Sequence, residues 1–110
     1  MKIIFKDLPK VSLNAWYGGG HWSKRKKLKD NYTLIVKSQF KDVLPASESY
    51  NTEYHFTFKL RPLDASNCVA MIKMIEDIIF ESDGYKTIRS ILITSYKGES
   101  DMVEIKINKK

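Results

Sequence analysis

The chain has 110 residues, 43% of them hydrophobic, and a formal net charge of +6, which suits one domain over residues 1–110 with a single core. No apolar run approaches the roughly 18 residues that cross a bilayer and no apolar signal region opens the chain, so we expect a cytoplasmic, non-membrane protein that begins at Met1. Its one cysteine, Cys68, excludes an internal disulfide and favours a reducing compartment, and the positive charge favours a polyanionic partner.

The first predicted element is a short strand at residues 2–6, K-I-I-F-K, which ends before Pro9. Trp16 and Trp22 then flank three consecutive glycines, which suits a loop that approaches its neighbours closely. The glycines lack a following G-K-[ST], so this is no P-loop. The two tryptophans would either contact unstacked bases or anchor the loop to the core, and the sequence leaves both roles open.

A basic helix follows, from an N-cap at Ser23 to about Val43, and Pro45 ends it. Cations in a first helical turn oppose the helix dipole, and bound phosphates would relieve that cost. The alternative is an ordinary solvated charged face. The cations of this run are Lys24, Arg25, Lys26, Lys27 and Lys29. The predicted apolar stripe consists of Leu28, Tyr32, Ile35, Val36 and Val43.

Residues 52–61 alternate apolar and polar side chains, which predicts a strand buried on one face. His55 belongs to the polar face, where it would meet solvent or phosphate. Only His21 and His55 are present, without Cys or His partners at ligand spacing, so we expect no zinc site. The residues predicted to face the core are Tyr54, Phe56, Phe58 and Leu60.

The segment 61–83 is the one around which we expect the fold to be organised. Pro62 ends the preceding strand, and Asp64 or Ser66 can cap the helix that follows. Helical periodicity places one broad apolar face on this helix, which we expect to be core. That face consists of Cys68, Met71, Ile72, Ile75, Ile78 and Ile79.

Charged residues occupy the opposite side of the same helix. Lys73 and Asp77 are i, i+4 partners there. Asp64 falls on their stripe if the helix begins near it, and Asp83 adds a further carboxylate in the loop after the helix. Convergent carboxylates would hold Mg²⁺, which can orient and polarise a phosphodiester. The alternative is that these residues only cap the helix, form a surface pair and make a turn.

Residues 87–96 and 102–108 complete the chain as two strands, with 97–101 as a hairpin loop between them. The predicted order is therefore β-α-β-α-β-β. We expect an α/β (α+β) fold in which a mixed sheet carries two packed helices.

The order of these motifs resembles that of the RusA-like Holliday junction resolvases, whose pattern is D-x-D-N at a helix start, a lysine inside the helix and an acidic pair in the next loop. Residues 12–27 and 97–107 resemble the opening and closing segments of the family, so the likeness spans nearly the whole chain. The matching residues of the central segment are Asp64, Asn67, Lys73, Asp77 and Asp83.

This resemblance implies a Mg²⁺-dependent endodeoxyribonuclease, with Mn²⁺ as a substitute, that nicks four-way junctions or other branched DNA as a homodimer. Lys73 would position an acid or stabilise charge on the scissile phosphate. The implied catalytic residues are Asp64, Asp83, Lys73 and Asp77. The implied metal ligands are Asp64, Asp83, Asp77 and Asn67. The implied DNA-binding residues are Lys24, Arg25, Lys26, Lys27, Lys29, Arg61 and Trp22.

Two positions depart from the family pattern in residue type, and Lys73 lies about one helical turn further from Asn67 than the lysine of the family usually does. Ser66 stands where the second aspartate of D-x-D-N is expected, and Ser82 replaces the first acid of the loop pair. Asn67, Asp77 or Glu76 would then complete the metal shell. The departures also fit a junction-binding protein of the same fold that cuts weakly or not at all. A third interpretation is a small basic interaction protein.

Overall fold

The computed structural model describes residues 1–17 and 22–110, and for Asn14, Tyr17 and Trp22 it describes the backbone alone. The predicted order β-α-β-α-β-β is confirmed, with a short extra helix before the basic one and a 3₁₀ turn before the central one. The elements are β1 (Lys2–Lys6), α1 (Leu13–Tyr17), α2 (Trp22–Gln39), β2 (Tyr50–Phe58), η1 (Ala65–Cys68), α3 (Val69–Ile79), β3 (Ile88–Lys97) and β4 (Met102–Lys109).

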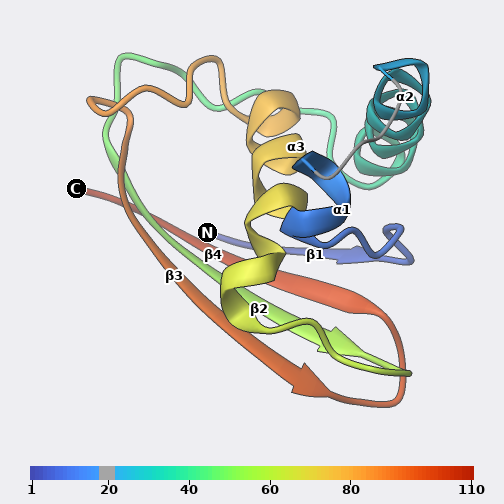
Figure 1. The fold of residues 1–110 in the computed structure, drawn as a ribbon. Coiled ribbons are helices and arrows are strands. Elements are labelled where there is room, and N and C mark those ends of the chain that lie inside the picture. Colours follow the sequence, from blue (N-terminus) through green and yellow to red (C-terminus); the bar gives the residue numbers. More distant parts are fainter. Residues whose placement is uncertain (18–21) are drawn as a thin grey trace.

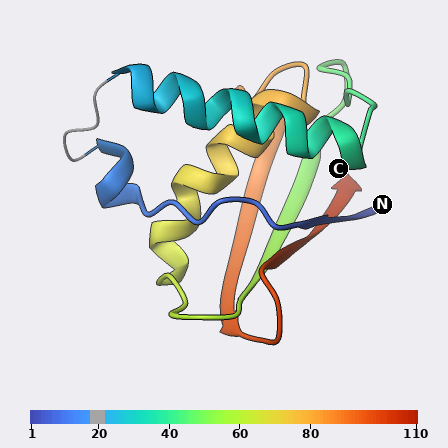
Figure 2. The same ribbon diagram turned by 90° about the vertical axis from the view of Figure 1, so that its right-hand side faces the viewer.

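Four strands of the described chain form one mixed sheet in the order β1-β4-β2-β3. β2 pairs in parallel with β3, while β4 runs antiparallel to both β1 and β2. The chain between β2 and β3 passes through η1 and α3, which supply the crossover that a parallel pair requires. Figures 1 and 2 show that the helices all lie on one face of this sheet.

The predicted hairpin between the last two strands is wrong, because β2 lies between β3 and β4. The loop at 98–101 therefore passes over the end of β2. The N–H of Gly98 donates to the carbonyl of Phe58 at 3.0 Å, and the N–H of Lys59 donates to Oδ1 of Asp101 at 2.8 Å. These bonds satisfy backbone groups where β2 ends and fix the crossing.

The core lies between the sheet and α3 and extends to α2, whose Tyr32 and Val36 are fully buried. Tyr54, Phe56 and Phe58 of β2 are at most 2% exposed, as predicted, whereas Leu60 lies beyond the strand and is exposed. Each large apolar side chain buried here stabilises the fold by roughly 1.5–3 kcal/mol. Asp64 makes no side-chain capping bond in the described structure, and a cap is worth about 1 kcal/mol. Packing therefore holds α3 in place.

The basic helix α2 ends at Gln39, four residues before the predicted end near Val43. Val43 is exposed, and Leu44 is buried in its place. Leu44 exchanges backbone hydrogen bonds with the end of α3, because its N–H donates to Ile79 at 2.8 Å and its carbonyl accepts from Glu81 at 2.9 Å. The chain leaves the helix to make this bridge. Within residues 1–17 and 22–110, no helix is long and apolar enough to cross a membrane.

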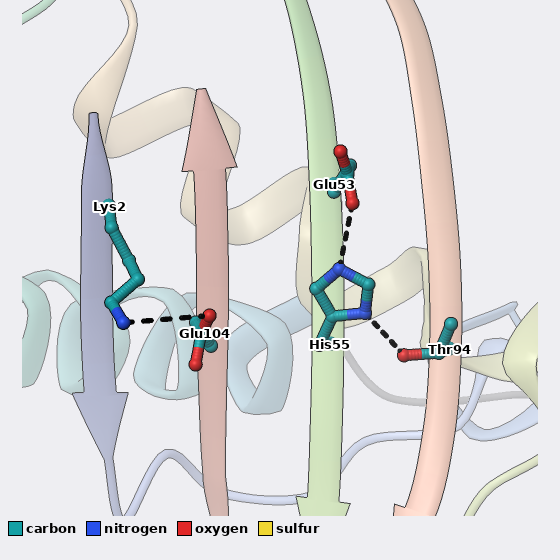
Figure 3. Close-up of polar contacts among 5 residues, drawn as sticks. All are labelled: Lys2, Glu53, His55, Thr94 and Glu104. Atoms are coloured by element: carbon teal, nitrogen blue, oxygen red, sulfur yellow. Dashed lines mark hydrogen bonds and ion pairs between the residues drawn. The ribbon is translucent and has the colours of Figure 1, made fainter. Parts of the chain in front are cut away.

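The polar side chains drawn in Figure 3 lie on the face of the sheet opposite the helices, which also exposes the apolar side chains of Ile4 and Leu92. His55 lies there, as predicted, with Nδ1 2.6 Å from Oγ1 of Thr94 and Nε2 2.9 Å from Oε1 of Glu53. Lys2 approaches Glu104 to 3.9 Å on the same face. His55 is therefore held by its neighbours on the sheet, away from the surface that carries the helices.

Candidate nucleic-acid interface

Lys10 joins the N-terminal segment to the turn that follows β2. Its Nζ donates to the carbonyl of Arg61 at 2.7 Å and lies 5.9 Å from the ring centroid of Phe58. The hydroxyl of Tyr32 in α2 donates to the carbonyl of Pro9, which ties the same segment to the basic helix. α1 packs against η1 and α3 nearby (Figures 1 and 2). Elements far apart in the sequence therefore meet at one surface.

Two pockets adjoin at Lys10, and we refer to them together as the Lys10 groove. The first has a volume of about 220 Å³ and is lined by Lys10, Arg61, Pro62, Leu63, Asp64 and Asn67. The second, which we call the Trp16 pocket, has a volume of about 230 Å³ and is lined by Lys10, Trp16, Lys24 and Arg25 over the apolar residues Val11, Ala15 and Leu28. Lys10 lines both, so a ligand that spans them meets cations along its length.

Three cations of α2 gather around Trp16. Cζ of Arg25 and Nζ of Lys29 lie 5.4 and 5.7 Å from a ring centroid of Trp16, within cation–π range. Lys24 lines the same pocket. Nε of Arg25 is buried and has no hydrogen-bond partner among the residues that the structure describes. The first turns of α2 thus present a donor and two further cations around an aromatic ring.

The remaining cations of the basic run are directed elsewhere, because a helix distributes consecutive residues around its axis. Lys26 pairs with Asp30 at 3.2 Å on the exposed side of α2. Lys27 is exposed and lines neither pocket of the Lys10 groove. The side chain of Trp22, which was predicted to contact DNA, lies outside the described part of the chain. The glycine loop and His21 also lie outside it. The run is therefore not one uniform patch.

Asp64 and Asn67 lie at the acidic end of the Lys10 groove. Asp64 is exposed and directly precedes η1, and its carbonyl accepts a hydrogen bond from the N–H of Asn67 at 2.8 Å. Arg61 and Lys10 line the same pocket. Two predicted metal ligands and one predicted DNA-binding residue are thus brought together here, beside a lysine that sequence reasoning missed. Nothing in the sequence around Lys10 singles it out, because its role depends on a tertiary contact.

The other predicted acids lie at the far end of α3. That helix has 11 residues and is therefore about 16 Å long, and η1 adds to the separation. Asp77 lines a pocket between α3 and α2 with Lys29. Asp83 follows α3 and lies close enough to Glu76 to raise the pKa of that carboxyl. One chain therefore does not gather Asp64 with Asp77 and Asp83.

Glu76 is a buried carboxylate that sequence reasoning treated only as a substitute ligand. It is 4% exposed, and burial raises its pKa to about 7, with further upward contributions from Asp83 and Asp77 and an opposing one from Lys73. Its Oε2 has no hydrogen-bond partner within the described chain. The sequence signal for its burial was its position four residues after Ile72, which places Glu76 on the apolar side of α3.

The predicted Mg²⁺ ligand set does not fit one ion within a single chain. Among residues 1–17 and 22–110, no group of three or more His, Cys, Asp or Glu side chains is arranged to hold a metal. Lys73 and Asp77, both described, form no ion pair with each other either. Asp64 and Asn67 alone share a pocket, and two cations share it with them.

Cys68 should react very slowly with thiol reagents in the folded protein. It is fully buried, and burial together with the charge of Asp64 raises its pKa to about 11. Compared with an ordinary value of 9.0, this lowers the thiolate fraction by roughly 10²-fold. We expect labelling at pH 8 to be at least about 10²-fold slower in buffer than in urea. Equal rates would show that the thiol is accessible in the native state.

The described side chains form a cationic groove with an aromatic ring at one end and Asp64 at the other. A separate carboxylate group lies at the far end of α3. No protein-family model and no curated protein matches the chain.

Proposed function

We propose that the protein binds DNA along the Lys10 groove. The observation that carries this proposal is that Lys10, Lys24, Arg25 and Arg61 line two adjoining pockets although they come from separate segments of the chain. The net charge of +6 adds long-range attraction for a polyanion. Cations along a groove neutralise phosphates and release their counterions, which is the main source of affinity for nucleic acid.

Branched DNA is the partner that we favour, and the RusA-like motifs support it. The same resemblance implies a homodimer, whose two grooves would be related by a two-fold axis, as are pairs of arms in a four-way junction. Binding is measured by titrating a labelled four-way junction and a linear duplex of equal length. The proposal predicts salt-dependent binding with a preference for the junction. Failure to bind either DNA at low salt would contradict the proposal that the protein binds DNA.

Metal-dependent cleavage of the bound DNA is the second candidate. It is favoured by the position of Asp64, which lies beside the cations that would hold phosphates. Mg²⁺ in nucleic-acid enzymes often takes only one or two carboxylates and completes its shell with substrate phosphates and water. Asp64 and Asn67 would be the residues of this chain that hold it, and the ion would supply Lewis-acid activation of the phosphodiester.

Replacing Asp64 by Asn separates binding from cleavage. In EDTA, Asp64→Asn should tighten junction binding a few-fold, because it removes a negative charge beside the phosphates. Asp83→Asn removes the same charge far from the groove and should leave the affinity unchanged. Both are measured by fluorescence anisotropy of the labelled junction. Equal effects of the two substitutions would contradict the placement of DNA in the groove.

The same variants test the second candidate when Mg²⁺ or Mn²⁺ is added. Nicks that form only with metal and disappear in Asp64→Asn would establish cleavage. Tight binding without nicks would leave the protein as a junction-binding protein. Loss of nicking in Asp83→Asn as well would require the far end of α3 to reach the cut strand, which means a contribution from a second copy.

A further inference from the structure

We propose that the Trp16 pocket receives an unpaired nucleotide, so that the protein prefers branched DNA with unpaired bases at the branch point over fully paired DNA. This inference rests on the proposed DNA-binding function. It names a part of the substrate, an exposed base with its flanking phosphate, and assigns it to one half of the Lys10 groove.

The lining of the Trp16 pocket matches the chemistry of a nucleotide. Its apolar part is formed by Val11, Ala15 and Leu28, and the half-buried ring of Trp16 adds an aromatic surface. Lys10, Lys24 and Arg25 supply three cations, and no carboxylate is among the described lining residues. Sites for single-stranded nucleic acid combine the same elements, an aromatic or apolar surface for the base and cations for the backbone.

Arg25 carries a buried hydrogen-bond donor that has no acceptor among the residues the structure describes. Its guanidinium lies over Trp16 at 5.4 Å, and its Nε is buried without a partner among the described residues. A buried N–H left without an acceptor is destabilising, because it has lost its hydrogen bonds to water. A base or phosphate oxygen would supply the acceptor once a rotation of the Arg25 side chain turns this buried N–H toward the pocket.

The size of the pocket favours a single planar group. Its volume of about 230 Å³ lies below the roughly 300–1,000 Å³ of sites for drug-sized ligands. A paired base cannot enter such a pocket, because its faces are covered by its neighbours in the stack. Only a base that is already unpaired, or that leaves the stack, would reach Trp16.

The adjoining half of the groove determines the path that the DNA strand would take away from the bound nucleotide. Lys10 lines both pockets, and Arg61 lies beyond it. A base in the Trp16 pocket would therefore have its next phosphate near Lys10 and the following one near Arg61. The strand would then continue toward Asp64, the residue on which the cleavage candidate depends.

The test uses two junctions that differ only at the crossover. One is fully paired, and the other carries unpaired thymidines at the branch point. Fluorescence is read in Trp22→Phe, which leaves Trp16 as the single tryptophan because the chain has two. Both junctions are also titrated as labelled DNA against the wild type and Trp22→Phe, so that any contribution of Trp22 to affinity is measured separately. We expect the junction with unpaired thymidines to quench Trp16 emission and to bind about ten-fold more tightly than the paired one, a typical contribution of one stacked base.

Trp16→Leu keeps an apolar side chain in place but removes the aromatic face. With labelled DNA, this variant should bind both junctions equally and bind the paired one as the wild type does. Trp16→Phe, which retains a smaller ring, should keep part of the preference and serves if the leucine variant fails to fold. Arg25→Gln should reduce the preference, whereas Lys41→Gln removes the same charge from an exposed segment after α2 and should preserve it.

The outcomes separate the two levels of the proposal. A preference that survives Trp16→Leu, or equal quenching of Trp16 by both junctions, would overturn the nucleotide pocket while DNA binding stands. Absence of binding to either junction would overturn DNA binding itself and the pocket with it. Loss of the preference in Trp16→Leu and its reduction in Arg25→Gln, with the preference preserved in Lys41→Gln, would establish the pocket.

Discussion

Replacing Lys10, Arg25 and Arg61 together by glutamine should weaken binding to a four-way junction by on the order of 10²-fold near physiological salt. Each of these cations lines the Lys10 groove, and each one that no longer neutralises a phosphate leaves about one counterion on the DNA. The slope of log affinity against log salt concentration should therefore become shallower by about 0.9 for each cation removed, close to three in all. Anisotropy titrations over a series of salt concentrations measure both quantities.

A matched triple substitution shows whether position or net charge is responsible. Lys26, Lys27 and Lys41 are exposed, and none of them lines the groove. Changing them to glutamine removes the same three charges, so the long-range attraction falls equally. We expect only a few-fold loss of affinity and little change of slope. An equal loss in both triple variants would mean that charge alone, without the groove, explains the binding.

The strands were predictable because their signal is local. In β2 the alternation from Tyr54 to Phe58 follows directly from the two-residue period of an extended chain. The neighbours of a strand are not encoded in that period. Nothing in the alternation of β3 and β4 indicates that β2 separates them. The hairpin was therefore predicted from short spacing, and the structure replaces it with a crossing over β2.

The acidic residues show a similar limit. Placing Asp64 on the stripe of Lys73 and Asp77 assumed that one α-helix runs through all three. The chain instead forms the 3₁₀ turn η1 first, whose residues rise further and rotate more per residue than those of an α-helix. Asp64 is thereby moved off the stripe and stays at the opposite end of α3 from Asp83.

The binding surface was predictable only in part. The basic run indicated α2 correctly, but it could not show that Arg25 and Lys29 face Trp16 while Lys26 pairs with Asp30. The rotation of about 100° per residue places these cations on different faces of α2. Which face meets Trp16 follows only once it is known which side of the helix packs on the core. Lys10 had no sequence signal at all, since its contact with Arg61 joins residues 51 positions apart.

Replacing Glu76 by glutamine should stabilise the protein at pH 8 and leave its stability almost unchanged at pH 5. Burial raises the pKa of Glu76 to about 7 from an ordinary 4.5. Between these values the native state keeps a proton that the unfolded state has released, so the free energy of unfolding falls as pH rises through this window. The change of the pKa from 4.5 to about 7 corresponds to about 3 kcal/mol, which the neutral amide does not lose. Urea unfolding of both proteins at several pH values measures the difference.

Asp77→Asn provides the matched control, because it removes a charge from the adjacent but exposed position of α3. Asp77 raises the pKa of Glu76 less than burial and Asp83 do. The free energy of unfolding of Asp77→Asn should therefore exceed that of the wild type by only a few tenths of a kcal/mol at pH 8. Its stability should still decline between pH 5 and pH 8. If Glu76→Gln declined as steeply as the wild type, Glu76 would have to titrate like an exposed carboxyl. Since the side chain is 4% exposed and its Oε2 has no partner in the described chain, we expect the pH dependence to be largely lost in Glu76→Gln and kept in Asp77→Asn.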